Sequence, residues 1–81
     1  MKTAIVGIGG VGGYYGGRLA NRFPPGSEHE IVFVCRGAHL EAIRRDGLKL
    51  LARDGDYVAR PALATDNAAE IGEFDVAIFT V

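Results

Sequence analysis

The chain has 81 residues, enough for one small domain, and with 48% hydrophobic and 23% charged residues it has the composition of an ordinary globular protein. Nine Lys and Arg are scattered among ten Asp and Glu, which excludes the basic stripe of most nucleic-acid-binding proteins. No apolar run approaches the roughly 20 residues that span a bilayer, no signal-peptide pattern follows the N-terminus, and the single cysteine cannot form an intrachain disulfide. We therefore expect a cytoplasmic protein that binds neither nucleic acid nor a membrane.

The N-terminal part of the chain predicts a strand, a helix and a second strand. Residues 4–8 form a short apolar run, typical of a strand buried on both faces of a parallel sheet. From 11 to 23, large residues recur every four positions beside a parallel series of small residues, which predicts a helix. A loop rich in proline and glycine over 24–27 then leads to a second apolar strand over 31–34, so the order is strand, helix, strand.

Four glycines lie inside this predicted helix, and each destabilises it by about 1 kcal/mol relative to alanine. They are Gly12, Gly13, Gly16 and Gly17. We expect a close approach to offset this loss, because a missing side chain at Gly12 and Gly16 lets the helix lie directly on the strands. It also lets the first turn of the helix reach a ligand.

The following segments predict a short helix and a hairpin. Residues 38–45 carry apolar side chains at helical spacing and stop at a glycine that is typical of a helix C-terminus, Gly47. Residues 48–51 and 57–60 are strand-like and flank Arg53-Asp54-Gly55-Asp56, in which Asp-Gly is a strong hairpin signal. We expect one of these two segments to join the parallel sheet.

The last segments predict one helical turn and one more strand. Asp66 or Asn67 is expected to cap a turn that runs to Ile71, and residues 74–81 form an apolar, β-branched strand. The predicted fold class is therefore α/β, a partial Rossmann fold whose doubly wound parallel sheet stops after about the fourth parallel strand.

The glycine turn between the first strand and the first helix predicts a dinucleotide-binding site. The G-x-G-x-x-G pattern occurs often by chance, and here the flanking strand, helix and second strand support it. Gly7 permits the tight turn, Gly9 has no side chain to block a pyrophosphate, and Gly12 lets the helix pack closely. The amides at the helix start add donors and a positive dipole end. The expected contacts are Gly7, Ile8, Gly9, Gly10, Val11 and Gly12. The alternative is that these glycines only end a strand and begin a loop.

The residues after the second strand indicate which dinucleotide is bound. NAD-specific domains place a carboxylate here for the ribose 2'-hydroxyl, whereas this chain has Arg36. A guanidinium favours the 2'-phosphate of NADP through charge-assisted hydrogen bonds. His39 is a second candidate contact to that phosphate. The alternatives are a solvated surface arginine and an exposed helix histidine.

Catalytic and metal-binding patterns are absent from the sequence. Cys35 lies beside Arg36, which favours a reactive thiolate, but a cysteine that ends a buried strand is usually a small hydrophobic residue. Tyr14 and Tyr15 are interpreted as packing or surface residues. No His and Cys cluster has metal-ligand spacing, and no Ser-His-Asp arrangement can be placed. We expect binding chemistry with no catalytic residue and no metal in this chain.

Several segments together carry a resemblance to a known family. They are Ile5-Val6-Gly7-Ile8-Gly9-Gly10-Val11-Gly12-Gly13-Tyr14-Tyr15-Gly16, Arg36-Gly37-Ala38-His39-Leu40, Asp46-Gly47-Leu48, Ala64-Thr65-Asp66 and Phe74-Asp75-Val76. Through them the chain resembles the N-terminal part of the ketopantoate reductase (2-dehydropantoate 2-reductase) family over essentially its whole length.

The resemblance implies a function and a set of contacts. The function is an oxidoreductase that transfers a hydride from NADPH to 2-dehydropantoate, a 2-keto acid, and gives pantoate for pantothenate biosynthesis. The implied cofactor contacts are the glycine turn at the pyrophosphate and Arg36 at the 2'-phosphate beside the adenine. Thr80 and Val81 are implied to lie close to the ribose, at the carboxyl end of the fourth parallel strand.

The chain departs from the family pattern in two places. The connection over 21–30 is longer than the family's usual turn, and the lysine, later strands and helical substrate domain that follow in the family are missing. We therefore expect residues 1–81 to be an N-terminal fragment of a dinucleotide-binding domain that is inactive alone. The strand over 74–81 would then lack a neighbour, and we expect self-association through its exposed edge.

Two other functions remain open on the sequence. One is a non-catalytic regulatory module that senses NAD(P). The absence of a catalytic residue is compatible with this module and with the reductase part alike. The other is a different NADP dehydrogenase, such as a hydroxyacid dehydrogenase relative, which the Arg36-Gly37-Ala38-His39 run disfavours. A lysine and a helical domain downstream of Val81 would favour the reductase over the sensing module.

Overall fold

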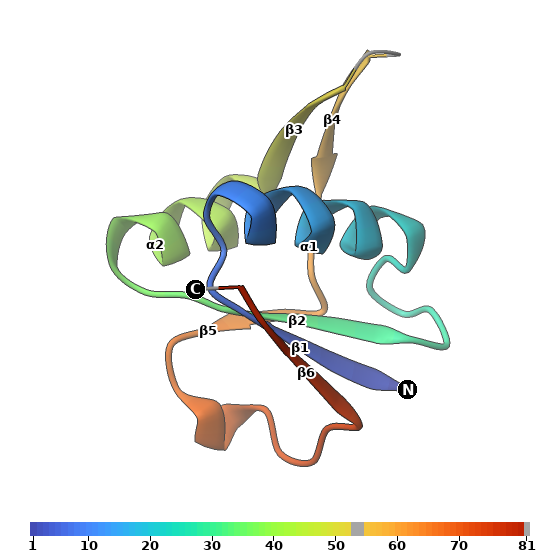
Figure 1. Ribbon diagram of the computed structural model, residues 1–81, viewed down its shortest axis with the longest axis vertical. Helices are drawn as coiled ribbons and strands as arrows, with labels where there is room; N and C mark the ends of the chain where they lie inside the picture. Colours follow the sequence, from blue (N-terminus) through green and yellow to red (C-terminus); the bar gives the residue numbers. More distant parts are fainter. Residues whose placement is uncertain (53–54, 81) are drawn as a thin grey trace.

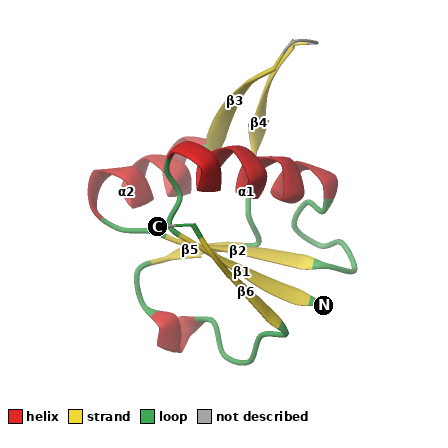
Figure 2. Cartoon of the chain, in the orientation of Figure 1, coloured by secondary structure: helices red, strands yellow, loops and turns green. Residues whose placement is uncertain are grey.

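A computed structural model describes residues 1–52 and 55–80, with side chains for all of these except 10–12 and 52. The elements in chain order are β1 (Lys2–Val6), α1 (Gly10–Arg22), β2 (Glu30–Val34), α2 (Gly37–Asp46), β3 (Leu48–Ala52), β4 (Gly55–Ala59), β5 (Leu63–Thr65), the 3-10 turn η1 (Ala68–Glu70) and β6 (Val76–Phe79). Both helices lie over one face of a sheet and η1 lies below the other, while the β3–β4 hairpin projects from the helix layer (Figures 1 and 2). In the part of the chain that is described, no helix is long and apolar enough to cross a membrane.

The main sheet confirms the predicted α/β class. Its four strands lie in the order β5-β2-β1-β6 and all three pairings are parallel. In the order of the parallel strands along the chain this is 3-2-1-4, the arrangement of one side and the centre of a Rossmann sheet. The chain therefore reverses its direction of growth at β1, which has β2 on one side and β6 on the other.

Side chains alternate between the two faces of this sheet, as strand geometry requires. On the helix side, Ile5, Ile31 and Phe33 form one buried cluster with Ala20 of α1 and with Leu40 and Ile43 of α2. On the other side, Ala4 and Val32 form a smaller cluster with Ile71, next to η1. The principal core is therefore the layer between the sheet and the helices, and this layer fixes where the helices begin.

Helix α1 approaches the sheet closely at Gly16, as predicted. A Cβ atom at Gly16 would lie 3.3 Å from Cε1 of Phe33 and 3.4 Å from Cγ2 of Ile5. Because Phe33 is fully buried, it has little freedom to move away. A side chain larger than glycine would therefore require the helix and the strands to move apart by a few tenths of an ångström. The corresponding contacts of Gly12 lie outside the described side chains.

The expectation that residues 48–51 or 57–60 join the parallel sheet is wrong. Among the described residues, β3 and β4 pair only with each other, antiparallel, from Leu48↔Ala59 to Ala52↔Gly55. Helix α2 ends at Asp46 and is capped by Gly47, whose φ of 82° favours glycine, and the chain then enters the helix layer instead of the sheet. The third parallel strand is β5. The predicted turn includes residues 53–54, which lie outside the residues that the structure describes.

The remaining predicted elements are present with shifted ends. The cap of η1 is Asn67 rather than Asp66, because the Asn67 side chain accepts a hydrogen bond from the Ala69 amide at 3.0 Å. The predicted strand over 74–81 is shorter in the structure, where β6 covers Val76–Phe79. The first strand likewise ends at Val6, which leaves Gly7 and Ile8 in the turn.

The hairpin packs on a second flat position of α1, and this packing predicts opposite effects for two glycines. A Cβ atom at Gly17 would lie 3.0 Å from Cγ of Leu50 and 3.2 Å from Cδ2 of Leu48, whereas a Cβ at Gly13 meets none of the described atoms within 4 Å. We expect Gly17→Ala to lower the free energy of unfolding by about 1 kcal/mol, because overpacking outweighs the gain in helix propensity. Gly13→Ala should raise it by about 0.5–1 kcal/mol. Urea unfolding followed by circular dichroism measures both, and a stabilised Gly17→Ala would contradict this packing.

Candidate nucleotide-binding site

A cavity of about 680 Å³ lies at the carboxyl ends of the parallel strands. Its walls come from all four strand ends: Val6, Gly7, Ile8, Gly9, Val34, Cys35, Arg36, His39, Asp66 and Thr80. In open α/β sheets, ligands bind in the crevice where the strand order reverses, and here that point lies between β1 and β6. The cavity therefore occupies the place that the sheet topology favours for a ligand, and it has a suitable size for a small molecule.

The glycine turn forms one wall of this cavity. Gly7 has a φ of 94°, a conformation that favours glycine, and its amide donates to the Val34 carbonyl at 3.1 Å. Gly9 is exposed and extended, and a Cβ atom at this position would meet none of the described atoms within 4 Å. The structure therefore gives Gly9 no packing reason to be glycine. Open space beside this backbone is what the close approach of a ligand requires.

The start of α1 supplies hydrogen-bond donors to the same wall. Gly9 is the N-cap residue and forms no side-chain cap, and the first turn contains no acidic residue. The first amides of a helix have no partner within it, and they carry the positive end of the helix dipole. They are therefore suited to an anionic group such as a phosphate.

The start of α2, which follows β2, also lies at the cavity. Arg36 is the N-cap residue of α2 in an extended conformation, and it is exposed, as is His39 one turn further on. Both residues line the cavity together with Gly7 and Gly9. Gly37, with a φ of 65°, makes the sharp entry to the helix. The structure thus brings the predicted arginine and the predicted glycine turn to one cavity, with a cationic side chain at one side and free amides at the other.

Cys35 lies between these two walls and has the properties of a packing residue. It is half-buried and packs against the main core. Burial raises the pKa of the Cys35 thiol, the charge of Asp66 raises it further, and only Arg44 acts in the opposite direction. The thiol is therefore protonated near neutral pH, which agrees with the interpretation as a small hydrophobic residue.

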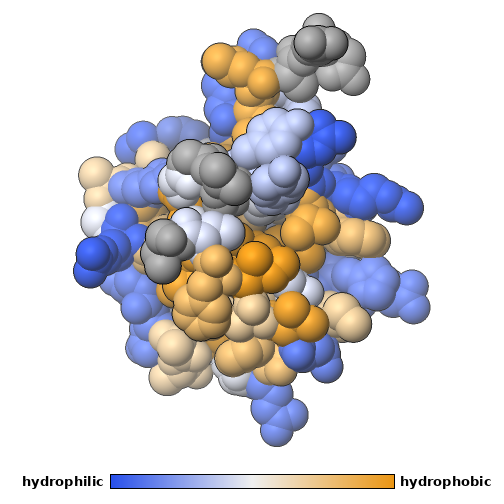
Figure 3. Space-filling view, in the orientation of Figure 1, coloured by the Kyte–Doolittle hydropathy of each residue, from blue (hydrophilic) through white to orange (hydrophobic). Residues whose placement is uncertain are grey.

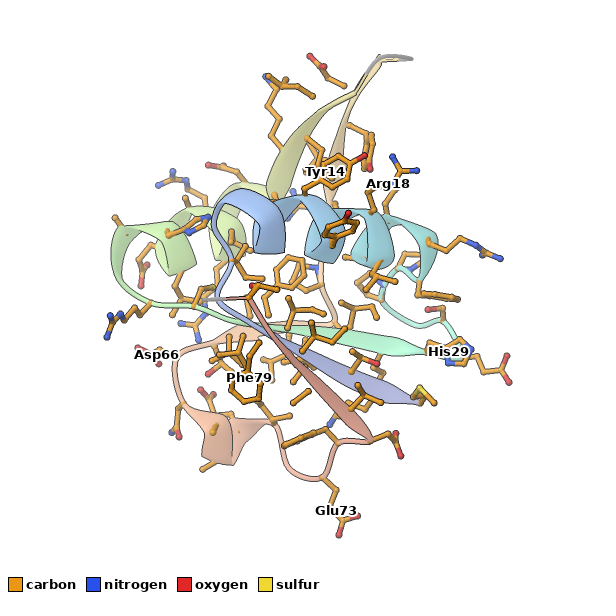
Figure 4. The ribbon with its side chains drawn as sticks, viewed as in Figure 1. Tyr14, Arg18, His29, Asp66, Glu73 and Phe79 are labelled. Atoms are coloured by element: carbon orange, nitrogen blue, oxygen red, sulfur yellow. The ribbon has the colours of Figure 1, made fainter. Side chains whose placement is uncertain are left out.

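Asp66 is the cavity residue that the sequence suggested only as a helix cap. It follows β5, where the fully buried Thr65 accepts a hydrogen bond from the Asn67 amide at 3.0 Å and donates to the Glu70 carboxylate. The Cys35 amide donates to the Thr65 carbonyl at 3.0 Å, which ties this loop to the end of β2. Figure 4 shows Asp66 at this end of the sheet. Its position directly after a parallel strand was the available signal, and it was missed because β5 was not recognised.

The other predicted site residues divide between described and undescribed positions. Thr80 lies directly after β6 and lines the cavity. The backbone of residues 10–12 forms the first turn of α1, but their side chains are outside the described part of the chain, as is Val81 altogether. Within the described residues, no group of three or more His, Cys, Asp and Glu is arranged to hold a metal ion.

The comparison with protein families assigns the chain. The family model described as "Ketopantoate reductase PanE/ApbA" matches residues 3–81. The chain belongs to the ketopantoate reductase family. The match covers the glycine turn, Arg36 and Thr80 alike, so the cavity lies entirely within the part of the chain that matches this family.

Similar proteins extend well beyond the length of this chain. A 2-dehydropantoate 2-reductase of Mesorhizobium japonicum is 37% identical over 81 residues, which are 100% of this chain and 23% of that protein. An uncharacterized oxidoreductase of Bacillus subtilis, YkpB, is 37% identical over 78 residues, 96% of this chain and 23% of that protein. The crystal structure of a 2-dehydropantoate 2-reductase from Porphyromonas gingivalis W83 matches with a TM-score of 0.88 and 47% identity, over 98% of this chain and 28% of that chain. The chain therefore spans about a quarter of the length of each of these three proteins.

The raised pKa of Cys35 predicts how this single thiol reacts. Only the thiolate is alkylated, so the folded chain should need a higher pH than the urea-unfolded chain to reach half of its maximal rate with iodoacetamide. The pH of this midpoint, followed by mass spectrometry, is the useful measure because partial burial lowers the rate at every pH. A midpoint below that of the unfolded chain would show instead an activated cysteine.

Proposed function

We propose that this chain is the NADPH-binding part of a ketopantoate reductase-like oxidoreductase. In this proposal, residues 1–81 belong to the dinucleotide-binding domain, and the whole protein transfers a hydride from NADPH to 2-dehydropantoate to give pantoate. One observation carries the cofactor assignment: Arg36 and the glycine turn line the same cavity at the reversal point of the sheet. The named relatives support the reaction, because two of those that match are 2-dehydropantoate 2-reductases.

The residues that line the cavity fit the two anionic parts of NADPH. The pyrophosphate would bind at the turn over 7–12, where Gly9 leaves open space and the first amides of α1 have no acceptor within the helix. The 2'-phosphate would bind at Arg36, whose planar guanidinium can donate two parallel hydrogen bonds to phosphate oxygens. His39, which also lines the cavity, would add a further donor.

We assign cofactor binding to this chain and no step of proton transfer. NADPH, when bound, supplies the hydride. Among the titratable groups that line the cavity, Cys35 is held protonated by burial, and we assign Arg36 to the phosphate as a hydrogen-bond donor. We propose that other residues of the whole protein bind the keto acid and protonate its oxygen. These residues would correspond to the regions of the relatives that this chain does not span.

Titration with the two nicotinamide cofactors tests the role of Arg36. We expect the chain to bind NADPH more tightly than NADH, and Arg36→Ala to weaken NADPH binding by roughly 10- to 100-fold, the effect of losing hydrogen bonds to a charged group. NADH binding should hardly change. Arg45→Ala removes the same charge from the other end of α2 and is the matched control.

Two results would contradict this assignment. One is equal affinity of the unmodified chain for NADH and NADPH, and the other is an unchanged preference in Arg36→Ala. Loss of NADPH affinity in Arg45→Ala to the same extent would show that net charge, rather than a contact at Arg36, determines binding.

We further propose that the 81-residue chain associates with itself through β6. Among the described residues, β6 pairs with β1 and with no other strand, so one edge of its backbone is open. Val76, Ile78 and Phe79 are all exposed, Phe79 to 69%. Apolar residues gather on this face of the molecule (Figure 3). An open apolar edge strand is a template for pairing with another chain.

Light scattering at increasing protein concentration tests this association. We expect the average mass to rise above that of the 8.6 kDa monomer, and Phe79→Lys to oppose the rise by placing a charge at the edge. Leu51→Lys is the matched control, because Leu51 is 75% exposed but lies on the hairpin. A chain that remains strictly monomeric at high concentration would overturn the proposal.

A further inference from the structure

Thr80 makes two contacts to the end of β1 and one to the start of the glycine turn. Its amide donates to the Val6 carbonyl at 3.0 Å, and its Oγ1 lies 3.1 Å from the same oxygen and 2.5 Å from the carbonyl oxygen of Gly7. A hydroxyl has one proton to donate, and the shorter distance assigns that proton to Gly7. The backbone of Thr80 thus continues the pairing of β6 with β1 by one residue, and its side chain extends the contact into the turn.

The peptide groups of Gly7 are held from both sides as a result. On one side the Gly7 amide donates to Val34, at the end of β2, at 3.1 Å. On the other side the Gly7 carbonyl accepts from Thr80. Gly7 itself has no side chain with which to fix its conformation, and glycine has more backbone freedom than any other residue. The two neighbouring strands therefore supply the restraint that the turn lacks.

We propose that Thr80 is a positioning residue that holds the glycine turn in the conformation that binds the pyrophosphate. The inference rests on the proposed NADPH site and adds a residue that acts on it through Gly7. The next residues of the turn, Ile8 and Gly9, line the cavity and lead directly into the first amides of α1. A shift of the Gly7 carbonyl would therefore also move Ile8, Gly9 and the first amides of α1, because they follow Gly7 directly along the backbone.

Removal of the hydroxyl should therefore affect one half of the cofactor only. Thr80→Val keeps the β-branched shape and loses the donor, which leaves the Gly7 carbonyl without this partner. We expect NADPH to bind roughly 3- to 10-fold more weakly, the effect of one neutral hydrogen bond. Binding of 2'-AMP, which carries the adenosine 2'-phosphate without a pyrophosphate, should not change, because Arg36 lies on another loop.

The experiment combines four variants and two probes. NADPH binding is followed by cofactor fluorescence, which is favourable because the chain has no tryptophan, and 2'-AMP binding is measured by calorimetry. Thr80→Ser retains the hydroxyl and should restore NADPH affinity to within about twofold of the unmodified chain. Gly9→Ala places a methyl group in the open space beside the turn and is the benchmark for selective loss of NADPH. Gly13→Ala, whose added Cβ meets none of the described atoms within 4 Å, lies within α1 and should leave both affinities unchanged.

Each outcome decides the inference. Selective loss of NADPH affinity in Thr80→Val with rescue by serine supports it. Unchanged NADPH affinity in Thr80→Val, or equal loss of NADPH and 2'-AMP, would overturn it, since equal loss indicates general loosening of the fold. If Thr80→Val does not give the native circular dichroism spectrum, Thr80→Ala replaces it in the same comparison. If the unmodified chain binds neither probe, the proposed cofactor site itself fails, and the inference fails with it.

Discussion

The close approach of α1 to the sheet at Gly16 is the constraint on which the rest of the structure depends. A Cβ atom there would lie 3.3 Å from the fully buried ring of Phe33, so the distance between helix and strands is set by the absence of a side chain. A helix held this close begins immediately above the end of β1, which leaves room for a turn of only three residues between Val6 and Gly10. The unpaired amides of the helix are thereby directed to the strand ends, where the cavity lies.

The cavity that results is built largely from backbone. Four strand ends contribute to it, yet the glycine turn and the two helix starts provide most of the groups suited to an anion, and Arg36 adds the side-chain charge. Backbone amides in fixed elements need no reordering when a phosphate arrives, which favours binding. Such a site also depends on the exact position of its loops. This is why a contact such as that of Thr80 with Gly7, which fixes the backbone at the start of the turn, matters to the cavity.

The parts of this fold that the sequence predicted are those governed by local patterns. The apolar runs, the glycines and the helical spacing predicted the β1-α1-β2 unit, and the position after β2 drew attention to Arg36. The hairpin was misplaced because Leu48 and Leu50 suit a parallel sheet as well as a flat helix surface, and only their contact with Gly17 decides between the two. Strand β5 has three residues, too few for a period to be visible. The Thr80 contact joins residues 73 apart and leaves no trace in any local window.

This separation along the chain also has a consequence for the order of events during synthesis. β1, α1 and β2 leave the ribosome first and can pair through contacts that are near in sequence, whereas the hydroxyl that holds Gly7 arrives only with residue 80. A nascent chain that has exposed the whole glycine motif therefore still lacks one of the two restraints on its first glycine. The second restraint on Gly7 is therefore acquired late, when β6 docks beside β1.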